Sequence, residues 1–154
     1  MAAKLPVHEK HEYPRILSWA LTYLHRRKLK YMNNSLKQYE LFGAMYMILI
    51  HVARFPGTSQ DAIVNHMNID KCTVARRTKK LAELGYITRE TDKNDRRQNN
   101  LYLTESGEKI IPVIREHLGI WSDDIFSCLN DDEKEVLVNL LTKVVENCMD
   151  EENR

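Results

Sequence analysis

The sequence has few of the residues that build enzyme sites, disulfide frameworks or zinc sites. Its 154 residues include five glycines, four prolines and three cysteines. The cysteines, Cys72, Cys128 and Cys148, are odd in number and widely spaced, which argues against a disulfide framework and a zinc finger. No glycine-rich phosphate loop, nucleophile elbow or HExxH stretch is present. We therefore predict no enzymatic activity, no cofactor and no resident metal.

Long hydrophobic runs are also missing. A membrane-spanning helix needs roughly 18 apolar residues or more. The longest candidate, Leu41 to Ala53, is too short and includes His51. No basic head followed by an apolar stretch opens the chain, so we see no secretory signal. The chain is expected to be cytoplasmic, with no membrane partner. Its length suits one domain, or one small domain with dimerising extensions.

The charge is unevenly distributed, although the formal net charge is only +1. Residues 70–100 hold nine Lys and Arg against five acids, a net charge of +4. Residues 130–154 hold three bases against eight acids, a net charge of −5. The basic stretch is suited to an anionic partner, and the acidic end should face away from it.

The first half of the chain predicts two helices. Residues 1–12 show no periodic pattern. Apolar residues at helical spacing predict a helix from Pro14 to Lys28, whose terminal cations suit the exposed carbonyls there. Ser35 can cap a second helix, Leu36 to Arg54, which is apolar on nearly every side and should be buried. We assign residues 1–34 to an N-terminal arm and a dimerisation helix.

Residues 35–107 predict a winged helix-turn-helix. Ser59 can cap a short helix, Gln60 to Met67, and Asp70 can cap the next one. Gly85 suits the left-handed position after that helix. Short strands are expected at residues 86–91 and 101–104, joined by a polar loop. The packed stripe of the second of these helices is expected to contain Val74, Arg77 or Thr78, Leu81 and Leu84.

Two further helices are expected within residues 108–154, the C-terminal dimerisation region. Thr104 can cap the first, in which Pro112 predicts a kink near residue 108 or a late start. Asn130 to Glu133 forms a capping box for the last helix. The first and last helices offer more apolar surface than one chain of this size can cover, so we expect an intertwined homodimer. The fold class is mainly α with a small β-hairpin wing (α+β).

The outward face of the helix after Asp70 is a candidate for contact with duplex DNA. Arg76 and Thr73 can read base edges, and Lys79 and Lys80 suit phosphates. The competing interpretation is an ordinary solvated charged face. The full set of candidates is Lys71, Cys72, Thr73, Ala75, Arg76, Lys79 and Lys80.

The tip of the expected hairpin carries Asp95, Arg96 and Arg97. An aspartate two residues before an arginine can hold its guanidinium in one rotamer, which reduces the entropy lost on insertion into a narrow minor groove. An ordinary charged turn is the alternative. The order of helix-turn-helix, strand, arginine loop and strand favours DNA binding over that alternative.

These motifs resemble the multiple antibiotic resistance regulator (MarR) family. The matching stretches are residues 56–60, Thr73 to Arg76, Leu81 to Ile87, Asp95 to Arg97 and Leu103 to Gly107. The resemblance implies an intertwined homodimer on a short palindromic operator, more often a repressor than an activator, released by a small molecule, a metal or oxidation. It assigns the arginine of the wing to Arg97, positioned by Asp95.

The resemblance also implies an effector pocket between the dimerising helices and the DNA-binding part. Five residues could line such a pocket for a small aromatic or phenolic effector: Trp19, Tyr23, Tyr46, His51 and Arg115. Core or interface packing is the favoured interpretation for any one of them. A metal-responsive regulator, suggested by His8 and His11, and a winged-helix protein-interaction module remain alternatives.

Overall fold

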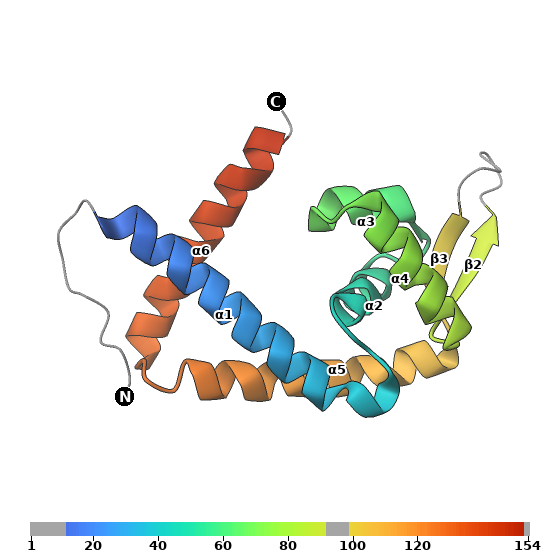
Figure 1. Cartoon of the computed structure of the whole chain (residues 1–154), viewed down its shortest axis with the longest axis horizontal. Coiled ribbons are helices and arrows are strands. Elements are labelled where there is room, and N and C mark those ends of the chain that lie inside the picture. Colours follow the sequence, from blue (N-terminus) through green and yellow to red (C-terminus); the bar gives the residue numbers. More distant parts are fainter. Residues whose placement is uncertain (1–11, 92–98, 153–154) are drawn as a thin grey trace. The chain divides into compact units, whose positions relative to one another are not determined.

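The computed structural model describes residues 12–91 and 99–152, and it divides into two compact units, residues 1–118 and residues 119–154. The chain is predominantly helical with one small sheet, as predicted (Figure 1). The helices of the first unit are α1 (Tyr13–Ser35), the 3-10 helix η2 (Lys37–Tyr39), α2 (Met45–Arg54), α3 (Gln60–Met67) and α4 (Lys71–Glu83). Helix α5 (Glu105–Ile125) begins in the first unit, and α6 (Asp131–Glu152) belongs to the second.

The sheet has three antiparallel strands rather than the predicted two. Strands β2 (Ile87–Thr91) and β3 (Asn99–Leu103) pair from Ile87↔Leu103 to Thr91↔Asn99. Strand β1 (Thr58–Ser59) pairs with the other edge of β3, which gives the order β1-β3-β2. A two-residue strand shows no alternation of apolar and polar residues, so its sequence carried no signal.

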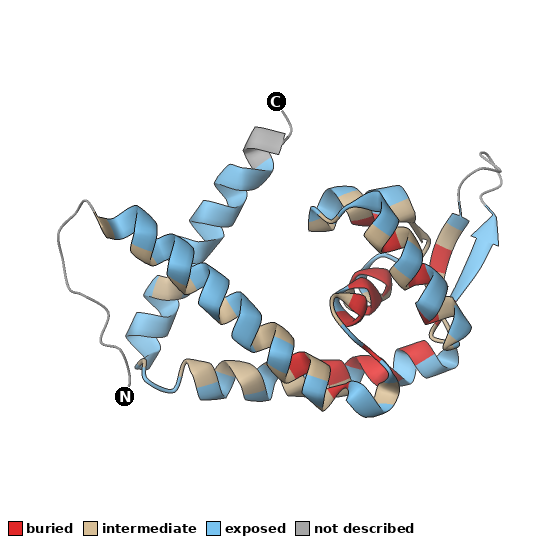
Figure 2. Ribbon diagram, viewed as in Figure 1, coloured by how far each residue is buried: buried red, intermediate tan, exposed pale blue. Residues whose placement is uncertain are grey.

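Helix α2 is the centre of the hydrophobic core. Figure 2 shows buried residues concentrated on α2 and on the first part of α5. Ile48, Leu49 and Val52 are fully buried, and they belong to one hydrophobic core with residues from every other element of the first unit except β1. The remaining core residues are Met32, Leu36, Leu41, Met45, Tyr46, Ile63, Val74, Leu81, Ile87, Leu101, Ile110, Ile111 and Ile114.

Helix α1 is longer than the sequence predicted. It continues past Lys28 for two more turns and ends at Ser35. The expected stop was wrong because Met32 and Leu36 extend the apolar stripe at helical spacing and are both fully buried. Burial of these two side chains stabilises the last two turns of α1. This stabilisation outweighs the preference of the cations at residues 26–28 for a helix end.

The predicted second helix is divided. Leu36 is the C-cap of α1 and η2 follows directly, so Ser35 does not cap a helix. Glu40 and Gly43 then adopt left-handed backbone angles (φ 56° and 62°), and α2 begins only at Met45. This break places Leu41, which is 1% exposed, in the core. The apolar run therefore reflected two buried segments joined by a turn, which periodicity alone does not distinguish from one helix.

Apart from Ser35, the predicted helix caps of the first unit are confirmed. Ser59 Oγ accepts a hydrogen bond from Ala62 N at 3.1 Å. Thr104 Oγ1 accepts one from Gly107 N at 3.0 Å, directly before α5. Helix α5 starts at Glu105 and runs through Pro112, so the late start was wrong. The proline leaves the carbonyl of Glu108 without its helical donor, and because Glu108 is exposed, water can serve instead.

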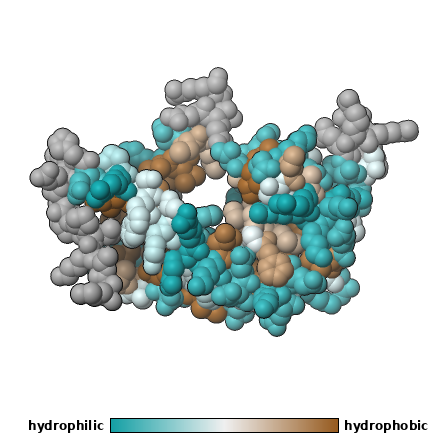
Figure 3. Space-filling model, in the orientation of Figure 1, coloured by the Kyte–Doolittle hydropathy of each residue, from teal (hydrophilic) through white to brown (hydrophobic). Residues whose placement is uncertain are grey.

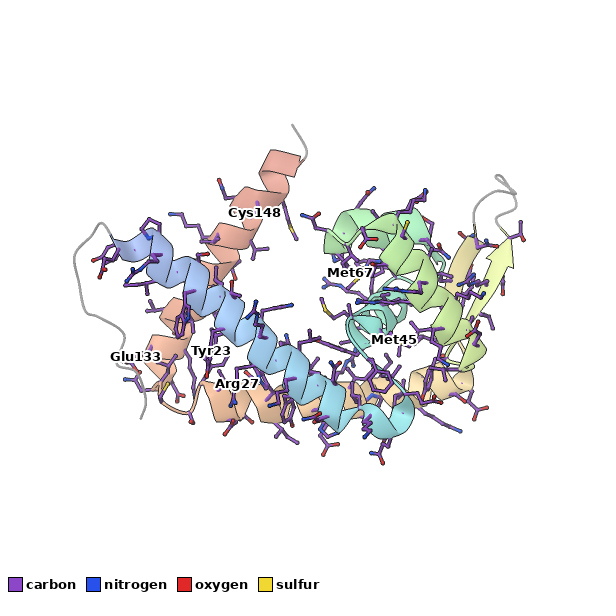
Figure 4. All side chains as sticks on the ribbon, in the orientation of Figure 1. Tyr23, Arg27, Met45, Met67, Glu133 and Cys148 are labelled. Atoms are coloured by element: carbon purple, nitrogen blue, oxygen red, sulfur yellow. The ribbon has the colours of Figure 1, made fainter. Side chains whose placement is uncertain are left out.

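Helix α6 begins with the predicted capping box. Asn130 N donates to Glu133 Oε2, and Glu133 N donates to Asn130 Oδ1, both at 2.9 Å. Glu133 is labelled at the start of the helix in Figure 4. The predicted apolar stripe of α6 is mainly exposed, with Val136, Leu140 and Val144 each more than half exposed, and hydrophobic residues are visible at its surface in Figure 3. Among the described residues, no helix is both long and apolar enough to span a bilayer.

Candidate nucleic-acid interface

Helix α4 is fixed at its N-terminus by Asp70. The Asp70 carboxylate accepts a hydrogen bond from Thr73 N at 2.8 Å, as predicted for an N-cap. Hydrogen bonds from Thr73 hold the pKa of Asp70 below its usual value. The cap leaves the first turn, with Lys71 and Cys72, exposed to solvent. The N-terminal half of α4 therefore begins at a defined residue and faces outward.

The inward side of α4 consists of Val74, Thr78 and Leu81, each 0% exposed. The sequence left Arg77 and Thr78 as alternatives, and the structure selects Thr78. Its hydroxyl donates to the backbone oxygen of Val74 at 2.9 Å, so its burial leaves no unpaired donor. Because these residues face the core, the candidate DNA contacts lie on the other sides of the helix. Lys71, Cys72, Arg76, Lys79 and Lys80 are exposed, and Thr73 and Ala75 are half-buried.

Two of the exposed lysines have acidic neighbours. Lys71 Nζ lies 2.8 Å from Asp61 Oδ1 of α3, and this pair links the two helices. Lys79 Nζ lies 4.0 Å from Glu83 Oε1, one turn along α4. Both pairs are largely exposed, and such pairs contribute little to stability. A phosphate can therefore compete for either lysine at small cost. Among the residues that the structure describes, no carboxylate forms such a pair with Arg76 or Lys80.

Strand β2 is attached to α4 through Arg89. Arg89 Nη2 donates to Thr78 Oγ1 at 3.2 Å. The sequence placed Arg89 in an expected strand and among the basic residues, but it indicated no structural role for this side chain. The bond connects the wing to the buried side of α4, so the helix and the first strand of the wing are held together. The predicted wing-tip residues Asp95, Arg96 and Arg97 lie outside the described residues.

The residues predicted for an effector pocket occupy three separate helices. Trp19 and Tyr23 stack on one another on α1, with ring centroids 5.1 Å apart, and both are 49% exposed. Tyr46 and His51 are buried in α2, and burial raises the pKa of Tyr46. Arg115 is exposed on α5.

His51 belongs to a cluster of rings at the end of α2. Its Nε2 lies 3.1 Å from Thr58 Oγ1, and its ring centroid is 4.9 Å from that of His66 and 5.0 Å from that of Phe55. Burial, followed by the charges of His66 and Arg54, lowers the pKa of His51. The histidine therefore joins α2, β1 and α3, and its burial favours the neutral form over the charged form.

The first unit has a surface hollow of about 320 Å³ at the root of the wing. None of the five predicted pocket residues lines it. Its lining comes from α2, β3 and α5 and from Pro56: Val52, Ala53, Pro56, Tyr102, Leu103, Glu108 and Ile111. No group of three or more His, Cys, Asp or Glu side chains that could hold a metal ion occurs in the described part of the chain.

Comparison with known proteins assigns this arrangement to a family. Residues 43–98 match the sequence profile of the MarR family. The HTH-type transcriptional regulator BilQ of Clostridium symbiosum (strain WAL-14163) is 32% identical over 102 residues, which cover 66% of this chain and 70% of that protein. This chain belongs to the MarR family.

Solved structures of MarR proteins share the fold. A MarR transcriptional regulator from Methanosarcina mazei Go1 superposes with a TM-score of 0.85 at 29% identity, covering 88% of this chain and 98% of that one. A Listeria monocytogenes protein assigned to the MarR family, crystallised with a 26mer DNA, has a TM-score of 0.79 at 24% identity and covers 86% and 89% of the two chains. As a MarR family member, the chain is a DNA-binding transcriptional regulator.

Proposed function

We propose that this regulator binds a palindromic operator in the cytoplasm as a homodimer, with the N-terminal half of α4 in the major groove. One observation carries the proposal: α4 presents exposed Arg76 and Lys80 on a helix whose opposite side is fully buried. Arginine pairs well with guanine, so Arg76 is assigned to base readout together with Thr73. Lys71, Lys79 and Lys80 are assigned to phosphates, which supply affinity without sequence information. Cys72 and Ala75, both small, permit close approach.

The wing is assigned to the adjacent minor groove. Arg97 would insert there, held in one rotamer by Asp95, with Arg96 beside it. The hydrogen bond from Arg89 to Thr78 supports this assignment, because it fixes β2 to the helix that enters the major groove. A wing fixed to α4 loses less conformational entropy on binding than a free one.

A second copy of the chain is assigned to the exposed apolar faces of α1 and α6. Leu17 and Leu21 of α1 are 62% and 56% exposed, and Val144 of α6 is 59% exposed. Apolar surface of this extent marks an interaction site, and homodimers are the commonest way to cover it. A two-fold dimer presents two α4 helices to DNA, which is why a palindromic site is proposed.

The regulator is proposed to act as a repressor that a small aromatic or phenolic effector modulates. The stacked and half-exposed pair Trp19 and Tyr23 offers an aromatic surface for such a ligand. Arg115 supplies a cation for a ligand carboxylate, and Tyr46 and His51 supply polar groups. Titrating the DNA complex with salicylate, as a probe of this ligand class, tests the idea. No release of DNA by any aromatic acid would contradict it.

The decisive test is selection of duplexes from a random-sequence library, followed by fluorescence anisotropy over a salt series. We expect about one dimer per duplex and a steep loss of affinity as salt rises, because phosphate contacts release counterions. Arg76→Ala should relax preference at one position by about 1–3 kcal/mol. Lys134→Ala, which removes an exposed base of α6, is the matched control and should leave binding unchanged.

Two results would overturn the proposal. An Arg76→Ala protein that selects the same sequences as the wild type would remove this residue from base readout. Binding that is weak and insensitive to salt for every selected duplex would favour the rival interpretation, a winged helix that binds another protein.

A further inference from the structure

Arg77 differs from the other basic residues of α4. Lys71, Arg76, Lys79 and Lys80 are exposed, whereas Arg77 is half-buried on the side of the helix that faces the protein. Burial lowers the pKa of Arg77, but an arginine keeps its charge under all ordinary conditions. A charged group that is drawn out of water on the inner side of a DNA-reading helix needs a structural reason.

The guanidinium of Arg77 packs against the backbone of Gly43, in the turn between η2 and α2. A Cβ atom added to Gly43 would come within 2.9 Å of Arg77 Nη2 and 3.2 Å of Arg77 Cζ. A Cβ at this position would push the guanidinium away, and the left-handed φ of 62° at Gly43 also favours glycine. The turn and the arginine therefore fit together closely.

Gly43 is held in turn by α1. Its backbone N–H donates to Asn33 Oδ1 at 2.8 Å, and Asn33 lies in the last turn of that helix. A continuous path of contacts thus runs from α1 through Asn33 and Gly43 to Arg77 of α4. A second tie lies beyond the other end of α4, where the Tyr86 hydroxyl donates to the backbone oxygen of Tyr39 in η2 at 3.2 Å.

From these contacts we infer that Arg77 is a positioning residue, which seats α4 on the turn at Gly43 and so makes the placement of the reading helix depend on the end of α1. Arg77 itself does not contact DNA. The inference rests on the proposed function, in which α4 reads the operator. It adds a residue that is not among the candidate DNA contacts. It also assigns residues 36–44 the role of transmitting shifts in the position of α1 to α4.

The salt dependence of binding distinguishes positioning from phosphate contact. Arg77→Met keeps the apolar stem and removes the guanidinium. We expect about a tenfold loss of affinity for a duplex selected by the wild-type protein, with an unchanged slope of log affinity against log salt concentration. Lys80→Met, the control, should weaken binding and reduce the slope by about one, as the loss of a phosphate contact does. Arg77→Lys keeps the charge but not the planar group, and should behave as Arg77→Met does.

Glycine substitutions test the contact itself. Gly43→Ala and Gly85→Ala both place alanine at a left-handed position, with φ of 62° and 76°, but a Cβ on Gly85 meets nothing within 4 Å. Both should lower the melting temperature by similar amounts. Only Gly43→Ala should also weaken DNA binding, by about tenfold, and the combination with Arg77→Met should lose much less than the sum of the two single losses.

The failure of this inference can be distinguished from failure of the proposed function. If Arg77→Met reduces the salt slope by about one, Arg77 contacts phosphate and the inference is wrong while α4 remains the reading helix. Equal DNA affinity of the two glycine variants would also overturn it. If neither Lys80→Met nor Arg77→Met changes affinity or slope, the proposed role of α4 is itself wrong.

Discussion

Gly107→Ala is expected to destabilise the protein strongly, because the residue lies where α5 meets the end of the α4–β2 connection. A Cβ atom on Gly107 would overlap the backbone oxygen of Tyr86, and it would lie 3.2 Å from Leu103 Cδ2. The Tyr86 oxygen cannot move away freely, because it accepts a hydrogen bond from Thr104 N at 3.0 Å. Thr104 in turn caps α5 through Gly107 N. Relief of the overlap must therefore shift the start of α5 as a whole.

The magnitude follows from the kind of contact. Overpacking a well-packed site costs about 1–3 kcal/mol, and occasionally more where backbone has to move. Since the overlap here is with backbone, we expect about 3 kcal/mol or more. In a chain of this size each kcal/mol shifts the melting temperature by about 2–4 °C, so the variant should melt roughly 6–12 °C lower.

Gly119→Ala in the same helix is the matched control. A Cβ on Gly119 meets nothing within 4 Å. Alanine at an exposed helical site is favoured over glycine by about 0.5–1 kcal/mol, so this variant should be slightly more stable than the wild type. Thermal and urea unfolding followed by circular dichroism measure both. If Gly107→Ala unfolds within about 0.5 kcal/mol of the wild type, the close packing derived from the structure is wrong.

Three further predictions concern the interface and its supports. Arg97→Ala should weaken operator binding strongly with little change in melting temperature, because we propose that its guanidinium binds DNA rather than stabilising the fold; an equal loss of both would make the residue structural. Thr78→Val should cost about 0.5–1.5 kcal/mol of stability, since it removes the acceptor of Arg89 Nη2 and the donor to Val74. The same substitution should cost less when it is made in the Arg89→Met variant. An unchanged cost in that variant would show that the hydrogen bond from Arg89 contributes nothing to stability. The pKa of His51 is lowered on folding, so the unfolded chain binds more protons than the folded chain as the pH falls from about 6.5. The free energy of unfolding should therefore decline below that pH and keep its full value above it. His51→Gln should flatten this dependence on pH, measured by urea unfolding at pH 5 to 8.

Local sequence was sufficient for most of the fold. Ser59, Asp70, Thr104 and Asn130 were predicted as caps, and each makes the expected hydrogen bond. Capping depends on a few neighbouring residues, so it can be deduced without knowledge of the tertiary structure. The winged helix-turn-helix between them follows from the order of the motifs, and the resemblance of these motifs to the MarR family is confirmed by the comparison with known proteins.

Tertiary packing decided two features that the sequence predicted wrongly or did not indicate: where α1 ends and why the chain turns at Gly43. Helix α1 continues through Ser35 because Met32 and Leu36 are buried in a core formed by other elements. The break at Gly43 accommodates the side chain of Arg77, which is 34 residues later in the sequence, so no local pattern could reveal it.

The same distinction applies to the candidate interface. The alternation of buried and exposed positions on α4 was readable from helical periodicity, which placed Arg76 and Lys79 outward. Periodicity did not choose between Arg77 and Thr78, because adjacent positions on a helix lie about 100° apart and both border the apolar stripe. The surrounding structure made the choice: Thr78 fits the interior by bonding its hydroxyl to Val74, whereas Arg77 extends to the turn at Gly43. Sequence alone determined which helix reads DNA in our proposal, and only the tertiary structure determined what holds that helix in place.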